Sequence, residues 1–187
     1  YGRLVYNGNT FTPISSLSDA IRKQTIVING VSKTYAMTGW RVGFAVGEPE
    51  IISGMAKIIS QTTSNLTSVS QYAAIEALTG DQSSIEEMRK AFEERLNTIY
   101  PLLAEVPGFE VIKPQGAFYL FPNVKKAMEI KGYTDVNDFT NAILEEAEVA
   151  LVTGAGFGAP ENIRLSYATD LDILKEAVRR IKAFMEK

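Results

Sequence analysis

Lys33 is the residue whose type and neighbours best suit covalent chemistry in this sequence. The 187 residues include neither Cys nor His, which excludes thiolate nucleophiles, disulfides, Ser-His catalysis, His general bases and most zinc sites. Any chemistry must therefore rest on Lys, Arg, Tyr, acidic side chains or hydroxyl groups. A lysine amine that is desolvated beside other cations becomes neutral and can form an imine with a carbonyl. Elimination alone thus favours lysine chemistry.

Lys33 lies in a polar loop, residues 31–40, between two predicted strands. Four residues make this loop more apolar than an ordinary exposed turn: Tyr35, Ala36, Met37 and Trp40. Arg41 opens the next strand, where its guanidinium could bind a phosphate through two hydrogen bonds. Loops at strand ends are where open α/β sheets bind their ligands. The alternative is a solvated surface lysine on a turn.

The run from Ser32 to Gly43, SKTYAMTGWRVG, closely resembles the cofactor-attachment signature of class I pyridoxal-phosphate aminotransferases, which have fold type I. A match over consecutive positions is far more specific than a lone glycine-rich loop. The resemblance implies that Lys33 is the Schiff-base lysine and that Arg41 binds the cofactor phosphate. It also implies that Tyr1, in YGRLVY, donates a hydrogen bond to the phenolic oxygen of the cofactor. A terminal tyrosine without a role is the alternative.

Two later segments extend the resemblance. PQGAFY at 114–119 resembles a strand motif of the small domain, and NIRLS at 162–166 resembles the segment whose arginine binds the substrate α-carboxylate. Strand alternation puts Ile163 and Leu165 on one face and Arg164 on the other. By itself this pattern favours a solvent-facing Arg164 on an edge strand. The resemblance instead implies a bidentate clamp on a carboxylate.

Three further positions bear on the site. Asn65 resembles a loop residue that reaches the active site of the partner subunit, and an ordinary polar loop residue is an equal alternative. Ser60 lies about where one branch of the family has an arginine for the distal carboxylate of a dicarboxylate. Residues 154–159, GAGFGA, formally fit a dinucleotide-binding fingerprint, but that motif must open a helix. A strand is expected after these glycines, so a turn is the better interpretation.

The elements that position these residues follow from the apolar pattern. Short β-branched or alternating runs predict strands at 24–29, 41–46, 109–112, 117–121, 150–153 and 163–168. Apolar residues recurring every three or four positions predict helices at 49–60, 69–78, 83–104, 136–147 and 171–185. Gly80 is expected to stop the second helix at C′, and Ser83 with Glu86 to form a capping box for the third. Pro101 is expected to kink or end that helix late.

The predicted fold class is therefore α/β, the C-terminal part of a fold-type-I enzyme. Residues 1–82 would complete a large mixed-sheet domain, 83–104 a connecting helix, and 105–187 a small α/β domain. The family's aspartate that pairs with the pyridinium nitrogen would precede Tyr1, as would its phosphate loop. Because that pairing keeps the cofactor an electron sink, we expect a truncated chain with little or no transaminase activity alone.

Charge and hydropathy exclude several partners. The net charge is −3 with dispersed basic residues, which argues against nucleic acid, and no apolar run reaches the length of a membrane span. The resemblance implies a cytoplasmic homodimer that moves an amino group between an L-amino acid, with aspartate expected, and a 2-oxo acid through pyridoxal phosphate. A lyase or synthase of the same fold remains an alternative, as does the aminotransferase-like effector domain of a transcription regulator.

Overall fold

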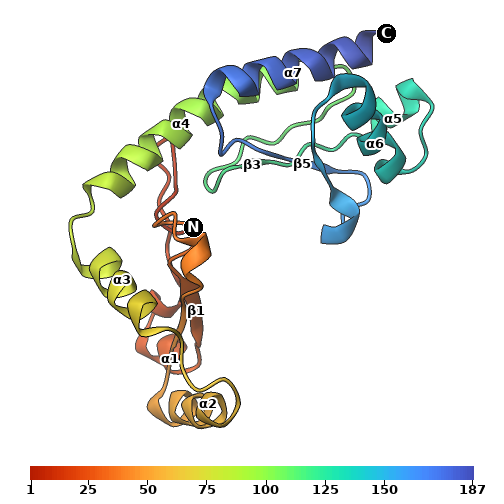
Figure 1. Cartoon of the computed structure of the whole chain (residues 1–187). Helices are drawn as coiled ribbons and strands as arrows, with labels where there is room; N and C mark the ends of the chain where they lie inside the picture. Colours follow the sequence, from red (N-terminus) through yellow and green to blue (C-terminus); the bar gives the residue numbers. More distant parts are fainter. The chain divides into compact units, whose positions relative to one another are not determined.

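The computed structural model describes residues 1–187, which form two compact units, Tyr1–Arg89 and Lys90–Lys187 (Figure 1). The boundary between the units falls within the long helix α4 (Ser83–Ala104). No helix combines the length and the apolar character that crossing a membrane requires. The division into residues 1–82, 83–104 and 105–187 remains a prediction about domain organisation.

The first unit contains a two-stranded antiparallel sheet, β1 (Val27–Gly30) and β2 (Gly43–Val46). Both strands begin later than predicted. The first predicted strand starts late because Gln24 is still the C-cap of α1 (Asp19–Lys23), a short helix that the apolar pattern did not predict, and residues 25–26 are coil. The second strand starts late because Arg41 has a left-handed backbone, with φ of 55°, which a strand cannot contain.

The core of this unit lies directly beneath the Lys33 loop. Val31 and Val42, which flank the loop, are buried together with Ala74 of α3 (Ser68–Thr79). Tyr35 and Met37 pack against this cluster. The apolar residues of the loop therefore anchor it to the helix, which fixes the backbone on either side of Lys33.

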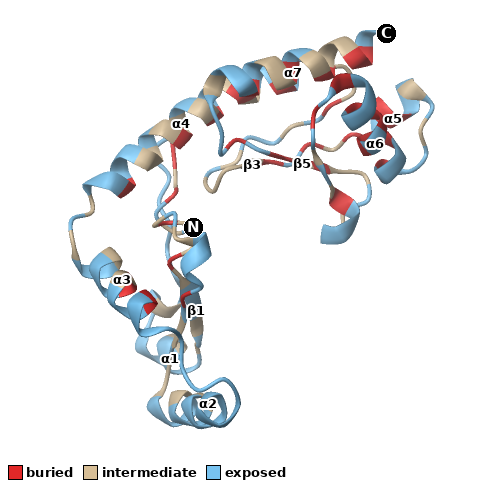
Figure 2. Cartoon of the chain, viewed as in Figure 1, coloured by how far each residue is buried: buried red, intermediate tan, exposed pale blue.

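Helix α2 (Pro49–Thr62) has a different environment. It contains no buried residue, and most of it is exposed (Figure 2). The apolar face that the sequence predicts for this helix is present, but Ile58 and Ile59 on that face are exposed.

Two capping predictions at the junction of α3 and α4 are wrong. Gly80 is the C-cap of α3 with φ of −77°, so it is not left-handed, and glycine is required because a Cβ would lie 2.7 Å from the carbonyl oxygen of Glu76. Ser83 is already the first helical residue of α4, and its backbone N–H and hydroxyl both donate to Asp81. These hydrogen bonds lower the pKa of Asp81. Glu86 instead pairs with Arg89 through two hydrogen bonds.

The second unit contains a three-stranded antiparallel sheet in the order β3 (Tyr119–Leu120), β5 (Ile163–Ser166), β4 (Val152–Thr153). Helices α5 (Lys125–Lys131), α6 (Val136–Ala147) and α7 (Leu171–Glu186) complete it. The predictions for α6 and α7 are confirmed to within one residue, whereas α5 was not predicted.

One predicted strand of this unit does not form. Residues 109–112 make a single isolated bridge, between Glu110 and Asn123, and Ile112 is 88% exposed. The β-branched pair Val111–Ile112 favours a strand locally, but no neighbouring strand pairs with it. Helix α4 includes Pro101 and ends at Ala104, so the expected late ending is confirmed.

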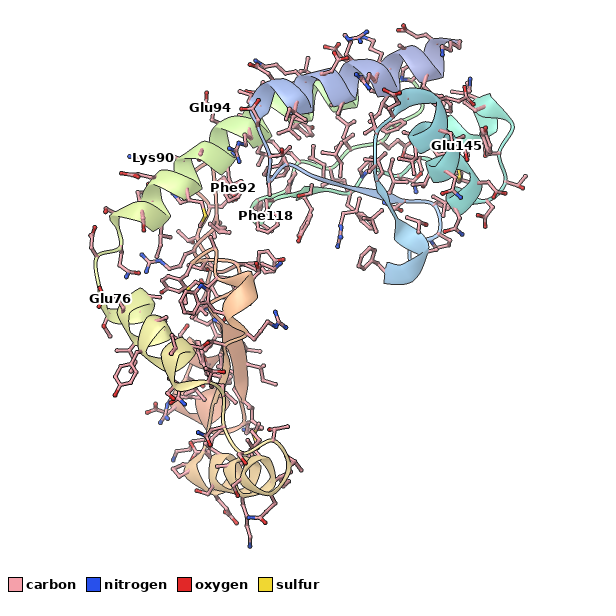
Figure 3. The ribbon with its side chains drawn as sticks, viewed as in Figure 1. Glu76, Lys90, Phe92, Glu94, Phe118 and Glu145 are labelled. Atoms are coloured by element: carbon pink, nitrogen blue, oxygen red, sulfur yellow. The ribbon has the colours of Figure 1, made fainter.

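An aromatic cluster holds the start of β3 against α4. Phe92 of α4 stacks on Phe118, with ring centres 5.2 Å apart. Both side chains are labelled in Figure 3. The ring of Tyr167 meets Phe92 edge-on at 6.3 Å, and its hydroxyl donates to the carbonyl of Ala117. This cluster fixes the backbone immediately before Tyr119 and immediately after β5.

Gly108→Ala is expected to destabilise the protein much more than Gly132→Ala. Both glycines have left-handed backbones, with φ of 78° and 77°, so either change adds about 1–2 kcal/mol of strain. A Cβ at Gly108 would also lie 2.5 Å from the backbone nitrogen of Ala127, whereas one at Gly132 meets nothing within 4 Å. We expect a total loss of roughly 3 kcal/mol or more for Gly108→Ala in chemical denaturation. Equal losses in the two variants would contradict this account of the packing.

Candidate active site

A pocket of about 370 Å³ lies where the β1 and β2 ladder opens into the Lys33 loop. Its lining combines the ends of both strands with the loop and the first residue of the chain: Tyr1, Asn29, Gly30, Ser32, Lys33, Arg41, Val42 and Gly43. The structure thus brings together Tyr1, Lys33 and Arg41, the three residues for which the sequence predicts contact with the cofactor. The lining contains two cationic side chains and no carboxylate, so its charge favours an anionic ligand.

Lys33 is half-buried in a turn held by local backbone bonds. The N–H of Tyr35 donates to the carbonyl of Val31, and the N–H of Ala36 donates to that of Lys33 itself. Ala36 has a left-handed backbone, with φ of 53°, an uncommon conformation for a residue other than glycine. Packing of Tyr35 and Met37 below the loop holds this turn in place, while Trp40 remains 44% exposed.

The Arg41 side chain is held at one of its nitrogens. Its Nη1 donates to the carbonyl of Thr38 at 2.9 Å. That bond uses only one of the five N–H donors of the guanidinium, so the remaining donors can bind a phosphate. The left-handed backbone of Arg41 turns the chain from the loop into β2 at this point.

Gly30 forms part of the pocket wall. A Cβ at this position would lie 2.8 Å from the carbonyl oxygen of Val42, so a larger residue would require the neighbouring backbone to move. This close approach explains why position 30 holds glycine in this chain.

Two sequence candidates lie outside this pocket lining. Asn65 is exposed in the short loop between α2 and α3, directly after the left-handed Ser64. Ser60 is exposed on α2, where its hydroxyl donates to the carbonyl of Lys57. The structure therefore does not bring Asn65 to Lys33 within this chain, and its role at a partner's site remains a prediction.

Arg164 lies on the central strand of the second unit, which excludes the alternative of a solvent-facing arginine on an edge strand. β5 pairs with β3 on one side and β4 on the other. The predicted alternation is confirmed, because Ile163 and Leu165 are buried while Arg164 faces the opposite way and is half-buried. Its guanidinium carbon lies 4.7 Å from the ring centres of both Tyr119 and Phe157, and it makes no salt bridge.

The glycine-rich segment after β4 is a turn, as the sequence predicts. Residues Gly154–Phe157 form a single 3₁₀ turn, η3, and Gly158 follows with φ of 73°. The chain then enters β5 rather than an α-helix, so a dinucleotide fingerprint is excluded here. Sequence reasoning missed that this turn brings Phe157 to Arg164.

Comparisons with known proteins place the chain in one family. The family model described as aminotransferase class I and II matches residues 1–181. The chain is 76% identical to an asparagine–oxo-acid transaminase of Streptococcus mutans and 56% identical to an aspartate aminotransferase of Bacillus subtilis, in both cases over 100% of this chain and 48% of the relative. It therefore spans about half the length of the curated relatives that it matches.

Solved structures give the same picture. An aspartate aminotransferase from Rhizobium meliloti superposes with a TM-score of 0.90 and 37% identity, over 100% of this chain and 48% of that one. An aspartate aminotransferase from Thermus thermophilus with maleate superposes with a TM-score of 0.85 and 34% identity, over 98% and 46% of the two chains. The arrangement of elements is thus that of these neighbours over half of their length.

Proposed function

Because this chain belongs to the aminotransferase class I and II family, we propose that it carries the lysine-bearing part of a transaminase active site. The family consists of pyridoxal-phosphate enzymes, and the neighbouring structures have fold type I. One observation carries the proposal: Tyr1, Lys33 and Arg41 line a single pocket that has no carboxylate. Two cations and a phenol suit a cofactor that bears a phosphate, a phenolic oxygen and an aldehyde.

Each of these residues has a definite task. Bound pyridoxal phosphate supplies an electron sink for the amino acid's Cα. Lys33 Nζ would hold the cofactor covalently, and its free amine would accept the proton from Cα as a general base. Arg41 binds the phosphate through its fork, and the Tyr1 hydroxyl donates to the phenolic oxygen.

Arg164 would bind the α-carboxylate of the substrate. Its half-buried guanidinium has no acidic partner in this chain, which leaves in-plane donors for a planar carboxylate. Such a clamp orients the substrate so that the bond from Cα to its hydrogen can be broken.

The amino donor proposed first is aspartate, as the sequence predicts, since several relatives are named aspartate aminotransferases. Asparagine is a second candidate, because a relative with 76% identity is named for it. Ser60 is consistent with asparagine, since a hydroxyl cannot replace the arginine that would bind a second carboxylate.

The homodimer remains a proposal, and so does the cytoplasmic location. Exposed apolar side chains support the homodimer, because surfaces rich in them are often covered by another polypeptide. They lie along α2, α3 and the loop between them: Ile51, Ile58, Ile59, Leu66, Val69, Tyr72, Ile75 and Leu78. Asn65 lies in the same loop, which fits a role at a partner's site.

Product analysis tests the proposed function. The intact protein, supplied with pyridoxal phosphate, 2-oxoglutarate and either aspartate or asparagine, is expected to form glutamate together with the matching 2-oxo acid. Turnover of the amino acid without glutamate would instead favour a lyase or synthase. Cofactor binding without any turnover would favour an effector domain of a regulator. Either result would reject transamination.

A further inference from the structure

Two aromatic rings lie close to the guanidinium of Arg164. Its central carbon lies 4.7 Å from the ring centre of Tyr119 and 4.7 Å from that of Phe157. Both distances are within the range of cation–π attraction. Phe157 in turn meets Phe121 edge-on, with ring centres 6.2 Å apart. The arginine therefore has an aromatic neighbour on each of two separate segments of chain.

The fold brings these rings to Arg164 by two routes. Tyr119 pairs directly with Ser166 across β3 and β5, so it lies on the same sheet face as Arg164, one diagonal step away. Phe157 ends the η3 turn, and the left-handed Gly158 then returns the chain toward β5. The glycine-rich segment thus has a physical role without any nucleotide, which is to carry an aromatic ring back over the strand.

The acidic side chains nearest to Arg164 in the sequence interact with groups other than its guanidinium. Glu161 pairs with Lys125 at 2.7 Å, and that hydrogen bond lowers the pKa of Glu161. Asp170 caps α7 by accepting from the N–H groups of Asp172 and Ile173. Aromatic rings stabilise a cation without neutralising it, whereas a carboxylate partner would compete with an incoming ligand. Arg164 is therefore held in place with its charge still available.

We propose that Tyr119 and Phe157 are positioning residues that orient the Arg164 guanidinium so that only its in-plane N–H groups meet the substrate. This inference rests on the proposed role of Arg164 as the carboxylate clamp. A guanidinium held beside two rings keeps its N–H donors along its planar edge, which matches a planar carboxylate bidentately. The two rings would thereby contribute to substrate affinity without touching the reacting atoms.

The experiment compares ring removal with ring retention. Tyr119→Leu and Phe157→Leu remove one ring each, Tyr119→Phe keeps the ring but loses the hydroxyl, and Arg164→Lys removes the fork. Maleate serves as a non-reacting probe for the intact, cofactor-loaded protein, with its Kd measured by calorimetry beside KM and kcat for the amino acid. We expect each leucine variant to raise both Kd and KM about 3- to 5-fold. Little change is expected in kcat, and Tyr119→Phe should match the unmodified protein.

The results separate this inference from the function on which it rests. If Arg164→Lys weakens maleate binding and the leucine variants do not, the positioning role is overturned and the clamp stands. If Arg164→Lys also leaves the Kd unchanged, the clamp itself is overturned. Loss of affinity in Tyr119→Phe equal to that in Tyr119→Leu would assign the effect to the hydroxyl and reject the ring. Phe157 is 54% exposed, so Phe157→Leu is expected to fold normally and provides the test even if Tyr119→Leu does not.

Discussion

Lys33→Ala is expected to abolish the visible absorption band of lysine-bound pyridoxal phosphate in the intact protein and to lower transaminase activity by at least about 10³-fold. The change removes both the attachment point for the cofactor and the base that takes the Cα proton. Arg41 and Tyr1 remain in the pocket, so some non-covalent binding of the cofactor should survive. Absorption spectroscopy after gel filtration, followed by the glutamate assay, measures both effects.

Two matched variants make the Lys33 result specific. Lys33→Arg keeps the positive charge but removes the nucleophilic amine, so it should lose the band as completely as Lys33→Ala. Lys57→Ala alters an exposed lysine of α2 in the same unit and should leave band and activity unchanged. A band that persists in Lys33→Ala would reject the assignment of the attachment site.

Arg164→Lys is expected to lower kcat/KM roughly 10²-fold, mainly through KM. A charge-assisted hydrogen bond contributes about 1.5–3 kcal/mol, and lysine cannot reproduce the bidentate geometry. The ammonium group also lacks the planar guanidinium that lies near the rings of Tyr119 and Phe157. Steady-state kinetics with the amino acid as the varied substrate measures the change.

Arg95 provides the control for Arg164. It too lies beside an aromatic ring of the second unit, 5.5 Å from the ring centre of Phe92, but on helix α4. Arg95→Lys therefore makes the same chemical change in a similar setting away from β5, and kcat/KM should stay close to that of the unmodified protein. Equal losses in the two variants would mean that Arg164 acts through general stability rather than as a clamp.

The site was more predictable from sequence than the local backbone around it. The run from Ser32 to Gly43 predicts Lys33 and Arg41 as pocket residues, and the pocket lining brings them together with Tyr1. The roles of these residues remain predictions. What the sequence could not show is that Tyr35 and Met37 pack downward onto α3, because that contact depends on a helix some forty residues further along the chain.

In the fold as well, features set by neighbouring residues were predictable, whereas features set by residues distant in the sequence were not. Apolar spacing predicts α6 and α7 to within one residue, because each helix buries one face and the apolar residues of that face recur every three or four positions within the helix itself. Strand assignments fail where a partner is needed: residues 109–112 have the right composition but no neighbouring strand. The central position of β5 depends likewise on β3 and β4, whose pairing no pattern within 163–166 reveals. The approach of Tyr119 to Arg164 follows from that pairing and was missed for the same reason.

Gly30 and Gly43 pair with each other at the end of the β1 and β2 ladder, and both line the Lys33 pocket. This part of the pocket wall is therefore main chain, with no rotamers to choose among. An arriving anion does not have to order side chains there, so the entropic cost of binding is smaller than in a wall built of flexible residues. A preformed wall of this kind should favour the rate at which the anion binds as well as its affinity, because no side chain has to move before the ligand enters.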